Sequence, residues 1–232
     1  MAQDPRKRQQ KLQKKATKRK SRQQDLVRAA SRLMMPSLRK AGEWPLHEVI
    51  LNERWNHPQT LTSVVVARRS PNGYIATGNF LVDRGCLGVK NAFGKLLDET
   101  EYRSFVRQLG EHQDLIQGDV HLAAKIVRDA VAYGRRFGFQ PNRDTPQAMY
   151  VLGNVDPDLC TIDIPLGGGD GKPFYFAGPY DDVDRIMAKL TKAVGADGFN
   201  YVLPLADPEF FEDDDDFLNY EPGPDSVEFD DE

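Results

Sequence analysis

Residues 61–82 read LTSVVVARRSPNGYIATGNFLV and contain two β-prone runs on either side of a turn. The runs 61–69 and 74–82 are rich in β-branched and aromatic residues, which favour a pleated strand with buried side chains. The four residues between them, Ser70 to Gly73, include the Pro, Asn and Gly that are typical of tight turns. The pattern predicts a β-hairpin.

The predicted sheet extends beyond this hairpin. A turn signal at 83–85, Asp-Arg-Gly, predicts that 86–89 returns as a third strand and completes an antiparallel meander. Upstream of the hairpin, 46–51 predicts another strand, and 199–203 predicts the last strand of the chain.

Four segments carry apolar residues at helical spacing, and three of them begin at an acidic residue that can cap a helix. Asp98 and Glu101 form a capping-box pattern, the next helix is predicted to run from about Asp119, and Asp181 is predicted to cap the last one. The predicted helices cover 26–34, 98–110, 119–137 and 181–195.

The stretch between the last two of these helices carries weaker signals. A Pro-containing linker at 140–146 leads to an apolar segment at 149–152, and 161–166 and 173–177 flank a Gly-Gly-Gly-Asp-Gly turn that predicts a second hairpin. Strand pairs therefore alternate irregularly with helices, which favours an α+β fold over a doubly wound sheet. We expect a single α+β domain over 25–206, with about four helices packed on an antiparallel sheet built from hairpins.

Charge is separated along the chain, although the net charge of the whole chain is only −4. Residues 1–24, the basic arm, hold ten Lys and Arg and one acid. Residues 207–232, the acidic tail, hold thirteen acids and no base, while 25–206 holds 21 of each sign. Neither end has the apolar content to bury a core, so both are predicted to be disordered.

The basic arm indicates polyanion binding, which needs only dense positive charge because neutralised phosphates release condensed counterions. We predict a non-enzymatic, nucleic-acid-associated protein, with RNA favoured over DNA; the alternative is a solubilising arm without a defined partner. The arm contains no aromatic residue, so base stacking is unavailable and binding is expected to be independent of sequence. The predicted phosphate-contacting residues are Arg6, Lys7, Arg8, Lys11, Lys14, Lys15, Lys18, Arg19, Lys20 and Arg22.

The acidic tail is open to three interpretations. It could be a solvated end that aids solubility, or it could mask the basic arm if the two ends emerge on one side of the domain. The tail also carries five aromatic residues among its acids, which suits an adaptor that docks this segment on an apolar groove of a protein partner. These residues are Phe210, Phe211, Phe217, Tyr220 and Phe229.

Residues 80–90, FLVDRGCLGVK, are the densest candidate for chemistry. Asp83, Cys86 and Lys90 fall around one turn, and a Lys near a Cys can lower the pKa of the thiol towards a reactive thiolate. This interpretation predicts a small enzyme with Asp83, Cys86 and Lys90 as catalytic residues. The alternative is a buried strand cysteine beside an aspartate at a turn, and no histidine lies nearby in sequence to act as a base.

The sequence indicates no metal site and no cofactor. The four histidines lack metal-binding spacing, and the glycine-rich run before Lys172 departs from a phosphate-binding loop because Pro173 stands where Ser or Thr is needed. No apolar run is long enough to span a membrane, and no secretory signal follows the basic start. We therefore expect a cytoplasmic protein with reduced thiols.

Three segments carry a resemblance to a known family: FLVDxxCLGVK at 80–90, YGRRFGFxP at 133–141 and GKPFYxxGP at 171–179. Together with the Lys- and Arg-rich start, the chain resembles an uncharacterised family of bacterial hypothetical proteins over roughly 1–204. The resemblance implies that 25–206 forms one domain. It implies no activity, ligand or catalytic residue, and the acidic tail lies outside it.

Overall fold

The predicted hairpin lies at the centre of the sheet. The computed structural model describes residues 37–57 and 61–203, and in it β2 (Thr62–Arg69) and β3 (Ile75–Asp83) pair in an unbroken antiparallel ladder from Thr62↔Val82 to Arg69↔Ile75. The chain then returns as β4 (Gly88–Leu97), a longer strand than the predicted 86–89, which pairs antiparallel with β3.

Two further strands complete the main sheet. β1 (Leu46–Asn52) pairs antiparallel with β2, and β5 (Leu115–Gln117) pairs antiparallel with β1, which gives the strand order β4-β3-β2-β1-β5. The α+β class and the antiparallel sheet built from hairpins are confirmed. β5 was not predicted because its three residues are too few to carry an alternation signal.

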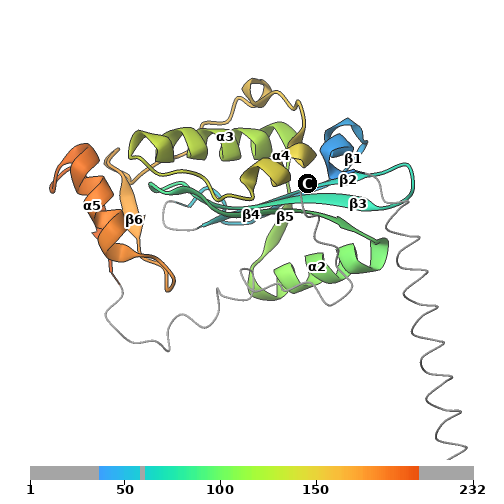
Figure 1. Ribbon diagram of the computed structural model, residues 1–232, viewed down its shortest axis with the longest axis horizontal. Coiled ribbons are helices and arrows are strands. Elements are labelled where there is room, and N and C mark those ends of the chain that lie inside the picture. The colour runs from blue at the N-terminus through green and yellow to red at the C-terminus, as the bar shows by residue number, and fades with distance from the viewer. Residues whose placement is uncertain (1–36, 58–60, 204–232) are drawn as a thin grey trace, which may run out of the picture. The chain divides into compact units, whose positions relative to one another are not determined.

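Helices cover both faces of this sheet, which explains why the residues of its central strands, β2 and β3, are buried along almost their whole length. Val64 and Val66 of β2 contact one buried cluster, whereas Val65 and Ala67 contact another, as the twofold alternation of a strand requires. The first cluster includes residues of α3 (Val120–Arg136) and α4 (Thr145–Leu152), and the second includes residues of α2 (Glu99–His112). Figure 1 shows α3 and α4 on one face and α2 on the other.

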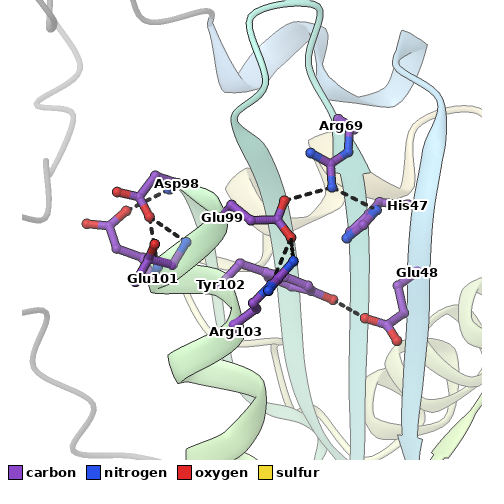
Figure 2. A network of polar contacts seen from close by, with 9 residues as sticks. His47, Glu48, Arg69, Asp98, Glu99, Glu101, Tyr102 and Arg103 are labelled. Carbon is purple, nitrogen blue, oxygen red and sulfur yellow. Dashed lines mark hydrogen bonds and ion pairs between the residues drawn. The ribbon is translucent and has the colours of Figure 1, made fainter.

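α2 begins as predicted and is fixed to the sheet by polar contacts. Asp98 and Glu101 form the predicted capping box, in which the Asp98 carboxylate accepts the backbone N–H groups of Thr100 and Glu101. The Tyr102 hydroxyl donates to Glu48 of β1 at 2.6 Å. Figure 2 shows these contacts beside Glu99, which accepts from a guanidinium on β2 and from Arg103 one helical turn later.

A buried arginine of β2, Arg68, joins α4 to the face of the sheet that lies opposite α2. The Arg68 side chain donates from Nε to the carbonyl of Val151 at 2.6 Å and from its terminal nitrogens to the carbonyls of Trp44 and Leu152 at 2.7 and 3.3 Å. Val151 and Leu152 end α4, where carbonyl groups lack helical partners and the helix dipole favours a cation. Burial lowers the pKa of Arg68.

α4 lies in the stretch that the sequence predicted least well. It begins at Thr145, inside the predicted linker 140–146, and continues through the apolar segment 149–152. Two strand glycines permit its close approach, because a Cβ on Gly78 would lie 2.6 Å from the carbonyl oxygen of Ala148 and one on Gly94 would lie 3.0 Å from that of Gln147. The linker prediction is wrong for the last two residues of the segment, Thr145 and Pro146.

The C-terminal part of the described chain forms a smaller layer of its own. β6 (Phe174–Phe176) and β7 (Asn200–Val202) pair in parallel, and α5 (Val183–Val194) joins them. The predicted last strand is thus confirmed, but the predicted second hairpin is wrong, because 161–166 forms no strand and β6 pairs with β7. α5 is capped by Asp182, one residue after the predicted Asp181.

The remaining described elements are two short 3-10 helices, η1 (Leu38–Glu43) and η2 (Pro157–Leu159). α3 agrees with the predicted helix 119–137, and in the structure Asp119 caps it. The basic arm, the predicted helix 26–34 and the acidic tail lie outside the described residues. None of the helices in the described ranges is long and apolar enough to cross a membrane.

Candidate functional site

The three candidate catalytic residues lie at one end of the main sheet, where the β3–β4 turn meets the C-terminal layer. The backbone N–H of Phe174, the first residue of β6, donates to the carbonyl of Gly85 at 3.0 Å. Gly85 has to be glycine here, because an added Cβ would collide with the backbone carbonyl oxygen of Phe174. Figure 1 shows β6 and α5 together at this end of the sheet.

Asp83, the last residue of β3, shapes the turn through its side chain. Its Oδ1 accepts the backbone N–H groups of Cys86 at 2.8 Å and of Leu87 at 3.2 Å, and only 6% of the residue is exposed. Burial raises the pKa of Asp83, while these hydrogen bonds and the charge of Lys90 oppose the rise. The Asp83 carboxyl group is therefore committed to backbone donors of its own turn.

Cys86 lies beneath this turn with no exposed surface, in the cluster of buried residues that includes Tyr133, Tyr175 and Leu190. Burial raises the pKa of the Cys86 thiol well above its ordinary value, and the carboxylates of Asp83 and Asp181 raise it further. The charge of Lys90 acts in the opposite direction but is outweighed. The net shift is opposite to that of an activated thiolate.

Lys90 is directed away from the ladder by an irregularity in β4. Leu81 pairs with Asn91 and Val82 pairs with Val89, so Lys90 is the additional residue of a β-bulge, a feature that re-aims side chains. Its Nζ lies 2.9 Å from Oδ1 and 3.0 Å from Oδ2 of Asp181. Lys90 therefore has a carboxylate partner from the C-terminal layer.

Asp181 is the residue of this site that the sequence did not predict, because it was interpreted as a helix cap. Its Oδ2 also accepts the hydroxyl of Tyr175 at 3.2 Å and the backbone N–H of Gly178 at 2.9 Å. Burial raises the pKa of Tyr175, and the carboxylate of Asp181 raises it further. The Asp181 carboxylate thus gathers Lys90 of the main sheet with Tyr175 and Gly178 of the C-terminal layer.

The geometry of Asp83, Cys86, Lys90 and Asp181, the hairpin-end cluster, favours a structural function. Asp83 stabilises the turn, and the Lys90–Asp181 ion pair joins the turn-bearing strand to the segment that follows β6. Both residues are partly buried, so the loss of either partner would leave a poorly solvated charge, and the pair helps to hold the C-terminal layer on the sheet. Burial and the neighbouring carboxylates raise the pKa of the Cys86 thiol, which favours its protonated form.

We expect Cys86 to react with iodoacetamide at neutral pH only after the chain is unfolded, because its thiol is buried and its pKa is raised. Cys160 is also buried, so the measurement uses the Cys160→Ser chain, in which Cys86 is the remaining thiol. In the same assay, the Cys86→Ser chain shows how fast Cys160 is alkylated. Labelling of folded Cys160→Ser chain at the rate of a free low-pKa thiol would instead support the catalytic interpretation.

In the parts of the chain that the structure describes, no three His, Cys, Asp or Glu residues come together as a group that could hold a metal ion. Comparison of the chain with protein-family models, with curated proteins and with solved structures gave no match.

Proposed function

We propose that this chain is a non-enzymatic, cytoplasmic, nucleic-acid-associated protein that binds phosphates through its basic arm. The observation that carries the proposal is the concentration of ten Lys and Arg in residues 1–24 next to a segment, 25–206, with equal numbers of acids and bases. Because the middle of the chain has no net charge, the arm supplies the positive field that attracts a polyanion.

The composition of the arm sets the kind of binding. Its ten cations fall between Arg6 and Arg22, a charge density that suits a phosphate backbone. The absence of aromatic residues removes base stacking, so affinity follows charge rather than sequence. RNA is the simplest partner for such an arm in the cytoplasm, and DNA offers the same phosphate chemistry.

The acidic tail favours a second, compatible function as an adaptor. Its five aromatic residues lie among acids, a composition that suits docking on an apolar groove with a basic rim. In this proposal the arm binds nucleic acid while the tail holds a protein partner.

The salt dependence of binding tests the proposed function. If the arm neutralises about seven phosphates of a duplex, log K should fall with log[salt] with a slope of about −6 or steeper. The measurement is fluorescence anisotropy of a labelled duplex, RNA in one series and DNA in another, titrated with the full chain at several salt concentrations. A shallow slope, or a strong preference for one base sequence, would argue against phosphate binding through the arm.

A further inference from the structure

A group of cations lies where the C-terminal end of α3 meets α5. Arg135 and Arg136 are exposed in the last turn of α3, and α5 carries Arg185, Lys189 and Lys192 at a spacing that places them along one side of the helix. The Nζ of Lys189 donates to the carbonyl of Gly138 at 3.3 Å, which brings the α5 cations to the end of α3. We refer to these five residues as the α3–α5 patch.

Two of these cations are held in place by aromatic rings. The Arg136 guanidinium lies over the ring of Tyr133 at 5.3 Å and over that of Phe137 at 5.8 Å from the ring centroids. The Lys189 ammonium lies 5.1 Å from the ring centroid of Phe139. Such cation–π contacts restrict long side chains that would otherwise lose entropy on binding a ligand, so the charges are preorganised.

The patch keeps its positive charge, because its cations form no ion pair with a carboxylate of the described residues. Residues 133–139 contain no acid, and Asp184 is the one acid within α5. The end of α3 also stabilises cations, since the helix dipole is negative there. These features distinguish the patch from Arg103 of α2, which pairs with Glu99, and from Arg128, which pairs with Asp129 and Asp158.

We infer that the α3–α5 patch is a second phosphate-binding surface, built on the folded domain, for the same nucleic acid that the arm binds. The class of ligand, a nucleic acid, rests on the proposed function. The location of the binding surface rests on the contacts and exposure of the five patch residues. Arginine guanidinium groups donate two parallel hydrogen bonds to phosphate oxygens, and Arg136 presents such a group from a fixed position. The patch gives the domain a defined contact with the backbone that the arm alone does not provide.

The test is the salt dependence of duplex binding by the full chain carrying Arg135→Gln, Arg136→Gln and Lys189→Gln together. Loss of three phosphate contacts should make the slope shallower by about 3 and weaken binding about 500-fold at ~0.1 M salt. The matched control is the full chain with Lys40→Gln, Arg54→Gln and Arg107→Gln, which removes the same charge from exposed positions outside the patch. The control should bind within a few-fold of the unchanged chain.

Equal slopes and affinities for the patch variant and the control variant would overturn the inference, while leaving binding through the arm intact. Binding that survives deletion of 1–24 but falls with the patch variant would uphold the patch and refute the arm. If the full chain binds no duplex, both the α3–α5 patch and the basic arm are refuted as phosphate-binding surfaces. Thermal unfolding of each variant establishes that the domain is folded, and Lys189→Arg, which keeps the charge, should retain binding.

Discussion

Replacing Arg68 with Met is expected to lower the free energy of unfolding by about 3 kcal/mol, because three carbonyl groups lose their donor. The carbonyls of Val151 and Leu152 end α4, and that of Trp44 precedes β1, so no helical or strand partner replaces the guanidinium. Removal of a buried charge offsets part of the loss, since burial already lowers the pKa of Arg68. Urea unfolding followed by circular dichroism measures the change.

The neighbouring arginine provides the matched control. Arg69 points to the other face of the sheet, its side chain is 41% exposed, and it pairs with Glu99 at 2.8 Å. Exposed ion pairs contribute about 0–1 kcal/mol, so Arg69→Met should change the free energy of unfolding by no more than that. Similar losses for the two variants would show that the Arg68 contacts do not stabilise α4 as described.

The elements predicted correctly are those whose signals are local. The hairpin of β2 and β3 depends on two β-branched runs and a Pro-Asn-Gly turn, and α2 depends on a capping box whose two members lie three residues apart. In both cases the interactions that define the element lie within the element itself. The helix predicted over 119–137 from its apolar residues at helical spacing is likewise confirmed as α3.

The elements predicted wrongly depend on contacts between distant segments. β6 has three residues, and its partner is β7, which follows it only after α5. The glycine run before β6 resembles a turn, which is why a hairpin was predicted. Parallel pairing instead needs a crossover connection, and α5 provides it. α4 likewise depends on Gly78 and Gly94, which lie on strands far from it in sequence.

In the candidate site, too, residues close in sequence could be predicted, whereas a contact from a distant segment could not. Asp83, Cys86 and Lys90 are close in sequence, and the structure places them together at one turn. Asp181 lies 91 residues from Lys90 in sequence and is its ion-pair partner. The sequence around Asp181 gives no indication of this contact. In the α3–α5 patch, Arg135 and Arg136 are adjacent in sequence, whereas the contribution of Lys189 requires the packing of α5 against the end of α3.

The basic arm is proposed to supply most of the affinity for nucleic acid, so deletion of residues 1–24 should remove most of the binding. About seven lost phosphate contacts correspond to a slope shallower by about 6, which at ~0.1 M salt is about a millionfold loss of affinity. Deletion of the acidic tail, 207–232, serves as the control for shortening the chain, and circular dichroism checks that each truncated chain is folded. We expect the chain without 1–24 to show no detectable shift of a labelled duplex, whereas the chain without 207–232 should bind at least as tightly as the full chain. Unchanged affinity and slope after removal of 1–24 would contradict it.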